Sequence, residues 1–257
     1  MATAFGSFLG KGTVILGGDT RVSYEMLKGA VISGLTSVGM NVIDIGKVPT
    51  PTVQQMIRHY NADGGIVITA SHNPIMWNGI KLMNKTGSFL DDSEYEEYRK
   101  IYTSDSIDLV TWENLGTVKT DHDALKRHIQ KILSIVDVES IKKSGLRVMI
   151  DPNNGAGCVA NKLLLDELNV TYTILNKEPN GRFAHNPEPL KTNLSQIINE
   201  MQSGDYDIGF VQDADADRLV ILDENGTFIG EDYSLAFCLD QILETEPAPD
   251  KKIVVNL

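Results

Sequence analysis

The sequence is short of cysteine, of long apolar runs and of basic residues. Cys158 and Cys238 are its two cysteines, and they form no Cys-x-x-Cys pair. A disulfide scaffold and a cysteine-based zinc site are therefore excluded, and a reducing compartment is expected. No run approaches the ~18 apolar residues that span a bilayer, and residues 1–5 lack the basic flank and apolar stretch of a signal peptide. We expect a cytoplasmic protein that does not bind membranes.

Acidic residues outnumber basic ones by 35 to 23, which gives a formal net charge of −12. This charge repels phosphate-rich polymers and anionic lipids, so we expect no nucleic-acid partner. A phosphorylated ligand would have to be held by local cations, backbone N–H groups or a metal. The length of 257 residues is ample for a buried core and favours two domains.

Short apolar runs alternate with segments of helical periodicity along most of the chain. The first block reads strand 14–16, helix 24–38, strand 41–45, helix 52–60, strand 66–69, a segment at 79–83 and helix 92–101. The second reads strand 146–150, helix 155–168, strand 170–175, helix 194–201, strand 207–211 and a hairpin over 219–229. This alternation predicts two successive three-layer α/β/α domains with mixed, largely parallel sheets. We place them at 1–120 and 121–245, followed at 246–257 by a linker and the start of a third domain with a strand at 253–255.

The most informative motif directly follows an apolar strand and reads Asp213-Ala214-Asp215-Ala216-Asp217-Arg218. Adjacent carboxylates repel one another, and a divalent cation such as Mg²⁺ removes that cost. In a flat strand the first and last aspartates would lie ~13 Å apart at ~3.3 Å per residue. Oxygen ligands lie about 2.1 Å from Mg²⁺, so the segment must curl, and the small alanines would allow this. The alternative is a solvated acidic turn.

Two other interpretations of this motif involve known site types. Counted from Asp213, Glu224 falls at the last position of an EF-hand-like loop, but Arg218 stands where that loop requires glycine, and strands flank it. We reject that interpretation. A haloacid-dehalogenase-type phosphatase uses Asp-x-Asp after a strand, with the first carboxylate as nucleophile. Asp213 fits that pattern, although Asp217 replaces the usual Thr or Val, so this alternative stays open.

A second motif, Thr69-Ala70-Ser71-His72-Asn73-Pro74, also follows an apolar strand. An α/β sheet presents its ligand-binding loops at this position. Serine is a weak nucleophile without a base or metal, and no Gly-x-Ser-x-Gly elbow surrounds Ser71. A serine that carries a phosphoryl group would need its charge neutralised, which a metal on the acidic motif could do. The alternative is a capped turn with no catalytic role.

Together these motifs resemble those of the α-D-phosphohexomutases, which include phosphomannomutase/phosphoglucomutase and phosphoglucosamine mutase. Residues 69–74 with 78–81 resemble the family's active-site signature, and 213–218 its metal loop, with Ala214 for the first glycine. Residues 17–21 are similar to its Gly-Arg-Asp-x-Arg segment, with Gly18 for the arginine. Further matches lie at 151–157 and 186–189. The two main motifs occur in the family's order.

The resemblance implies a role for each matching residue. Ser71 corresponds to the phosphorylated serine, and Asp213, Asp215, Asp217 and a phosphate oxygen on Ser71 to the Mg²⁺ ligands. Lys81 corresponds to a proton-transfer residue, while His72 and Arg218 would lie near the transferred phosphate. We further expect Arg21 and Asn78 to bind substrate. The implied reaction moves phosphate between C6 and C1 of a phosphorylated hexose, with a hexose 1,6-bisphosphate as intermediate and activator.

The resemblance covers the first two of the family's four domains. The sugar-selecting segment of the third domain, the phosphate-gripping loop of the fourth and the family's opening strand have no counterpart in the sequence. We therefore expect the amino-terminal part of a phosphohexomutase that turns over poorly or not at all alone, because orientation of the hexose supplies much of the rate. The alternatives are half of a split enzyme that needs a partner chain, and a non-catalytic partner or assembly subunit. Surfaces left by the missing domains could also pair two copies of the chain as a homodimer.

Overall fold

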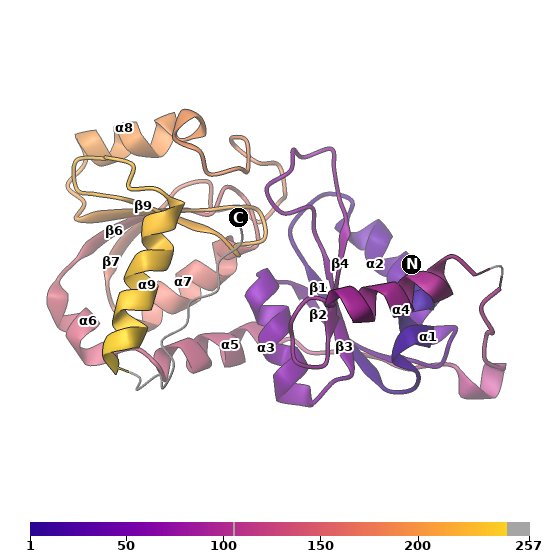
Figure 1. The fold of residues 1–257 in the computed structure, drawn as a ribbon. Coiled ribbons are helices and arrows are strands. Elements are labelled where there is room, and N and C mark those ends of the chain that lie inside the picture. Colours follow the sequence, from indigo (N-terminus) through magenta and orange to yellow (C-terminus); the bar gives the residue numbers. More distant parts are fainter. Residues whose placement is uncertain (105, 246–257) are drawn as a thin grey trace.

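Two α/β domains follow one another in the computed structural model, which describes residues 1–104 and 106–245 (Figure 1). The first contains α1 (Ala2–Leu9), β1 (Thr13–Gly18), α2 (Tyr24–Thr36), β2 (Asn41–Lys47), α3 (Thr50–Tyr60), β3 (Gly64–Ile68), β4 (Ile80–Asn84), α4 (Asp92–Tyr102) and β5 (Val118–Thr120). Its sheet has the order β4-β3-β1-β2-β5. β4 is antiparallel to β3, and the other pairings are parallel.

The second domain repeats this plan on a smaller sheet. It contains α6 (Val138–Ser144), β6 (Arg147–Asp151), α7 (Gly157–Glu167), β7 (Thr171–Ile174), α8 (Ser195–Ser203), β8 (Ile208–Gln212), β9 (Leu219–Leu222) and α9 (Glu231–Thr245). The strand order is β7-β6-β8-β9, with β9 antiparallel to β8. The predicted fold class, two α/β domains with mixed and largely parallel sheets, is therefore confirmed.

Alternation along the central strands explains the three layers. Successive residues of a strand point to opposite faces, so both faces of a buried parallel sheet must be covered. In β1, Val14 and Leu16 join a core with α1, α2 and α4, whereas Ile15 joins a core with α3. In the second domain, Val148 packs on the α7 side of the sheet and Met149 on the α8 side.

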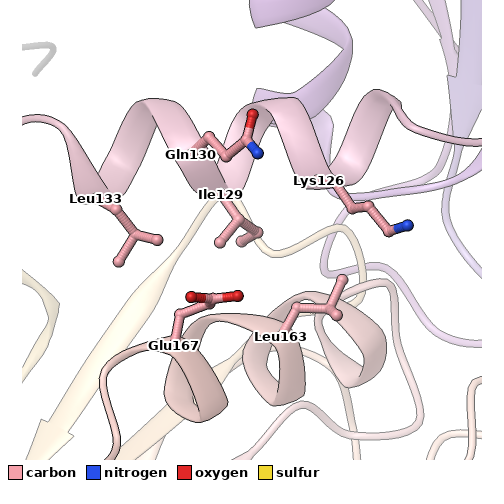
Figure 2. Close-up of a pocket in the computed structure, with 6 residues that line it drawn as sticks. All are labelled: Lys126, Ile129, Gln130, Leu133, Leu163 and Glu167. Atoms are coloured by element: carbon pink, nitrogen blue, oxygen red, sulfur yellow. The ribbon is translucent and has the colours of Figure 1, made fainter.

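Helix α5 (Ala124–Leu133) joins the two domains and was not predicted. It packs against α3 of the first domain and α7 of the second. Figure 2 shows Ile129 and Leu133 on its lower face, directed toward α7, which carries Leu163 and Glu167. The ring Nδ1 of His128 lies 2.8 Å from Thr52 Oγ1 on α3. A single amphipathic helix thus packs on both domains.

The predicted helices and strands overlap the observed ones, but α1, β5, α5, α6 and α9 are additions. The predicted boundary after residue 120 stays a prediction and lies between β5 and α5. The predicted linker and third-domain start at 246–257, with its strand at 253–255, lie outside the described residues. Within 1–104 and 106–245, no helix combines the length and apolar character that crossing a bilayer would require.

Candidate active site

The predicted site lies where loops from the two domains meet. Ser71 follows β3, and the acidic segment follows β8, both at carboxyl ends of parallel strands, where α/β sheets bind ligands. Lys81 lies on β4 opposite Val67, near the same end of β3. Thr50, the first residue of α3, contacts the acidic segment from the other domain. The sheet topology therefore brings together residues that lie far apart in the sequence.

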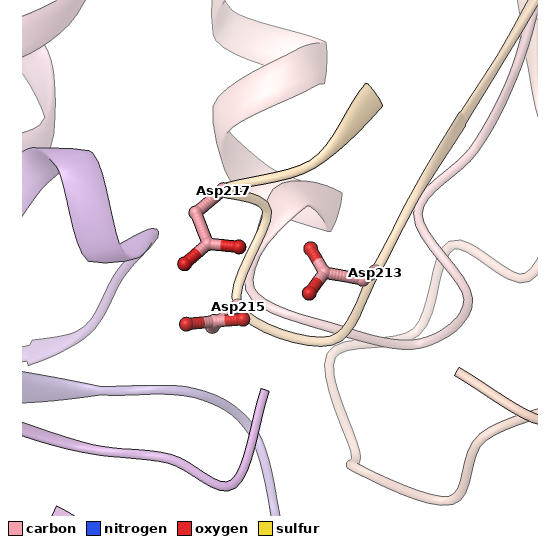
Figure 3. A group of neighbouring side chains, drawn as sticks. All are labelled: Asp213, Asp215 and Asp217. Carbon is pink, nitrogen blue, oxygen red and sulfur yellow. The ribbon is translucent and has the colours of Figure 1, made fainter. Parts of the chain in front are cut away.

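The acidic segment curls so that its three aspartates converge (Figure 3). One carboxylate oxygen from each of Asp213, Asp215 and Asp217 lies within 4.8 Å of the others. The curl depends on Ala216, which adopts the left-handed conformation at φ 54°. Asp213 and Asp215 are fully buried, whereas Asp217 is exposed. The arrangement presents several hard oxygen donors to one point.

Lys81 is the cation that faces these carboxylates. Its Nζ lies 2.7 Å from Asp215 Oδ2 and 2.8 Å from Asp217 Oδ2. Burial alone would lower the pKa of Lys81, but the two aspartates outweigh it and the pKa is raised. Burial has the opposite effect on a carboxyl and would raise the pKa of Asp215, but the charge of Lys81 and the hydroxyl of Thr50 outweigh it and the pKa is lowered. Lys81 is therefore protonated and Asp215 ionised at neutral pH.

Asp213 has the opposite balance. Burial and then the charges of Asp215 and Asp217 raise its pKa to about 9. Without a further cation Asp213 would therefore hold a proton at neutral pH, because the single ammonium of Lys81 does not offset three ionised carboxylates. Oδ1 of Asp215 is buried and has no hydrogen-bond partner among the described residues. Excess negative charge, hard oxygen donors and an unpartnered buried oxygen together fit a bound Mg²⁺.

Ser71 is next to this cluster. Its Oγ donates to Asp213 Oδ2 over 3.3 Å, a contact between the two domains. The serine has φ 51°, in the left-handed region that L-residues rarely adopt. Its N–H donates to Thr69 Oγ1 over 2.8 Å. Ser71, the three aspartates and Lys81 therefore form one constellation, as their expected shared site requires.

Three more predicted site residues lie close in sequence to this constellation: His72, Asn78 and Arg218. Nδ1 of His72 is buried without a partner among the described residues. Asn78 is half-buried and donates to Ser23 Oγ over 2.9 Å. The backbone N–H of Arg218 donates to Asp213 Oδ1 over 3.3 Å, while its side chain lies 3.6 Å from Glu231 on α9. Arg218 thus closes the acidic loop through its backbone.

Arg21, the last of the predicted site residues, lies inside the protein. Its side chain is completely buried beneath the Ser71 loop. Each of its five guanidinium N–H groups has an acceptor within the protein. In this structure Arg21 therefore acts as a structural partner of the loop, and its predicted contact with substrate stays a prediction.

Two family models match the chain. The model described as "Phosphoglucomutase/phosphomannomutase, alpha/beta/alpha domain I" matches residues 1–107, and the corresponding domain II model matches residues 126–226. The chain belongs to the phosphoglucomutase/phosphomannomutase family. This confirms the family resemblance of the sequence motifs, and the two α/β domains are domains I and II of that family.

Individual relatives agree with this assignment. A "Phosphoglucomutase/phosphomannomutase" from Thermococcus kodakarensis is 44% identical over 231 residues, which are 90% of this chain and 50% of that protein. A "Probable phosphoglucosamine mutase" from Methanopyrus kandleri is 39% identical over 255 residues, 99% of this chain and 55% of that protein. A solved structure from Thermus thermophilus, of a protein assigned as a phosphomannomutase, has a TM-score of 0.85 at 25% identity and covers 95% of this chain and 56% of its own. This chain spans about half the length of these curated relatives.

Two residues of this family site were not among the sequence predictions. Thr50 donates its hydroxyl to Asp215 Oδ2 over 2.6 Å and its N–H to the Asp215 carbonyl over 2.9 Å. Asp19 is fully buried and accepts from Arg21 Nε over 3.0 Å. Both follow parallel strands of domain I at their carboxyl ends, and that position is the signal that could have identified them.

Proposed function

We propose that this chain is the phosphoserine- and metal-bearing half of a cytoplasmic phosphohexomutase, which interconverts hexose 1-phosphate and hexose 6-phosphate. The observation that carries the proposal is the contact between Ser71 Oγ and Asp213 Oδ2, 3.3 Å long, within the acidic cluster. It is supported by membership of a family whose named relatives are phosphoglucomutases, phosphomannomutases and phosphoglucosamine mutases.

Mg²⁺ would be held by Asp213, Asp215 and Asp217 together with an oxygen of phosphorylated Ser71. When bound, it would offset the charge of the transferred phosphoryl group. This ligand set agrees with the excess carboxylate charge described above and with the unpartnered Oδ1 of Asp215.

The chain's own residues would handle the proton and the phosphate. In the forward step, the bond between phosphorus and Ser71 Oγ breaks as a bond forms between phosphorus and a hexose hydroxyl oxygen. The hydroxyl loses one proton and the serine gains one, so a residue that exchanges a single proton balances the step. We assign this role to Lys81, whose Nζ lies 2.7 Å from Asp215 Oδ2 and 2.8 Å from Asp217 Oδ2, in the cluster that Ser71 Oγ contacts. Its ammonium would donate a proton to the serine oxygen, and the resulting amine would accept the proton that the hydroxyl loses. The reverse step, with the phosphate on the other hydroxyl, rephosphorylates the serine.

His72 and the Ser71 loop would face the phosphate, while the groups that orient the hexose would come from sequence outside this chain. Since the chain spans about half the length of its curated relatives, we expect it to turn over hexose phosphate poorly alone. The missing groups would be supplied by a longer chain or by a partner chain. The surfaces that the missing domains would cover could instead pair two copies of this chain, and sedimentation analysis would detect that homodimer.

Phosphate transfer to the chain tests the proposal directly. Purified protein is incubated with Mg²⁺ and radiolabelled glucose 1,6-bisphosphate, then digested and analysed by mass spectrometry. We expect one phosphate on the peptide that contains Ser71, lost in Ser71→Ala and Asp213→Asn and kept in the control Ser203→Ala, which changes an exposed serine of α8.

The chemistry of the label separates this proposal from a haloacid-dehalogenase-type phosphatase. A phosphoserine resists hydroxylamine, whereas an aspartyl phosphate is cleaved by it. A hydroxylamine-labile label that survives Ser71→Ala would place the nucleophile on Asp213 and refute the mutase proposal. The absence of any label on the wild-type chain would also count against it.

A further inference from the structure

The loop that carries Ser71 has little apolar packing of its own. Its side chains Ile75, Met76 and Trp77 are 40%, 77% and 62% exposed. The left-handed backbone at Ser71 is a conformation that costs about 1 kcal/mol or more in an L-residue and persists where surrounding contacts over-determine it. Contacts from beneath the loop must therefore hold this backbone in place.

Arg21 supplies those contacts. Its two terminal nitrogens donate over 2.7–2.9 Å to four backbone carbonyl oxygens of the loop, those of Ser71, Asn73, Pro74 and Trp77. A planar guanidinium presents its donors in a fixed fork, so the four carbonyls are fixed relative to one another. The loop backbone is thus folded around one cation.

The charge of Arg21 is compensated from within domain I. Asp19 accepts from Arg21 Nε and, through the same Oδ2, from Thr69 Oγ1 over 2.7 Å. Thr69 Oγ1 in turn accepts from the N–H of Ser71. Thr69 and Ser71, near the start of the loop, are therefore linked through hydrogen bonds to Asp19, the carboxylate that orients Arg21.

Domain II covers the other side of Arg21. The guanidinium carbon lies 4.9 Å from the centroid of the Phe183 ring, a distance at which a cation and an aromatic face attract. Beside it, Thr20 Oγ1 donates to the carbonyl of Asn154 over 2.8 Å. Arg21 therefore contacts the serine loop on one side and domain II, which carries the acidic cluster, on the other.

We propose that Arg21 is a positioning residue, which fixes the Ser71 loop through its carbonyls and, through Phe183, sets that loop against domain II. Ser71 Oγ is thereby held at the acidic cluster. The consequence for catalysis rests on the proposed function, whereas the consequence for the loop does not.

Arg21→Lys tests this role, because lysine keeps the charge opposite Asp19 but has three donors on one nitrogen and cannot reproduce the fork. Arg58→Lys is the matched control, since the exposed Arg58 donates through Nε to a single carbonyl, that of Thr86. Hydrogen–deuterium exchange is followed by mass spectrometry on peptides covering residues 69–79. We expect exchange there to accelerate by about tenfold or more in Arg21→Lys, as the loss of one hydrogen bond to a charged group predicts, and to stay unchanged in Arg58→Lys.

Phosphate transfer to Ser71 gives the second measurement. At saturating glucose 1,6-bisphosphate with Mg²⁺, the transfer rate should fall about tenfold in Arg21→Lys, with less than a twofold change in the half-saturating concentration. If the wild-type chain accepts no phosphate, the proposed function fails but the exchange measurement still tests the loop. Unchanged exchange at 69–79 overturns the positioning role even if transfer slows.

Phe183→Leu keeps the inference testable if Arg21→Lys does not fold. Leucine keeps an apolar cover but loses the aromatic face, and residue 183 belongs to domain II. We expect faster exchange at residues 69–79 in domain I. Exchange equal to wild type would overturn the proposed link between the domains.

Discussion

Replacement of Thr50 by valine should weaken the contact between the two domains. The hydroxyl donates to Asp215 Oδ2 over 2.6 Å, and both side chains are at most 1% exposed. A hydrogen bond to a charged group contributes about 1.5–3 kcal/mol to stability. Valine has nearly the same shape and keeps the backbone donor to the Asp215 carbonyl. The expected loss for Thr50→Val is therefore about 2 kcal/mol in the free energy of unfolding.

Thr50→Ser is the matched variant. Serine keeps the hydroxyl and loses one buried methyl group, which costs about 0.8 kcal/mol. The valine variant should thus be less stable than the serine variant by about 1 kcal/mol or more. If Thr50→Ser were less stable than Thr50→Val, the lost methyl group would matter more than the hydroxyl, and the energetic role of the hydroxyl would be refuted.

Urea denaturation followed by far-UV circular dichroism measures both variants. Thr50 belongs to domain I and Asp215 to domain II, so the loss should appear in the transition in which the domains separate. Equal midpoints for wild type and Thr50→Val would also refute the prediction.

Three further predictions use other parts of the structure. Mg²⁺ at about 100 times its dissociation constant should raise the free energy of unfolding by about 2.7 kcal/mol, and a chelator should reverse this; no change with Mg²⁺ would contradict the metal assignment. Gly181 has φ 67°, and an added Cβ would lie 2.1 Å from the carbonyl oxygen of Thr20, so thermal unfolding of Gly181→Ala should show a loss of about 1–3 kcal/mol. Burial alone would lower the pKa of His185, but its hydrogen bond to Asp151 outweighs this and the pKa is raised. The contribution of His185 to stability is therefore complete below pH 6.5 and is lost as the pH rises through the higher pKa of the folded state. Burial lowers the pKa of His128, so its contribution is present above pH 6.5 and lost as pH falls. Urea unfolding is therefore measured at about pH 5.5 and about pH 8.5. His185→Gln should lose more free energy of unfolding at the lower pH, and His128→Gln should lose more at the higher pH. A loss that is the same at both pH values would contradict the assignment for that histidine.

The strands at the centre of each sheet were predictable because their own residues specify them. β1, β3, β6 and β8 are apolar runs that a buried parallel strand requires. β5 is different, since its three residues are exposed and it exists through pairing with β2. α5 has apolar residues at Leu125, Ile129 and Ile132, a helical periodicity that the sequence displays and that the prediction overlooked where charge rises and the strand pattern ends. Local periodicity does not show that α3 and α7 are its packing partners, because that depends on tertiary contacts.

The same reasoning applies to the site. Ser71 and the acidic segment were found because their chemistry lies in the side chains, which the sequence displays. The environment of Arg21 was not, because the acceptors around it are backbone carbonyls, and every residue has one. We predicted that Arg21, in the segment 17–21 that resembles a family motif, binds substrate. The structure shows that the loop itself satisfies that cation.

The contacts behind the reacting groups suggest how the site keeps its geometry. Ser71 and Asp213 lie on different domains, so their separation depends on how the two sheets are held together and not on either domain alone. Thr50 contacts Asp215 across the junction, and Arg21 contacts Phe183 across it as well. Neither contact involves a group that changes covalently in the proposed reaction. Substitutions there should therefore alter how often the serine oxygen and the metal ligands are correctly placed, which affects the rate of transfer more than the affinity for the phosphate donor.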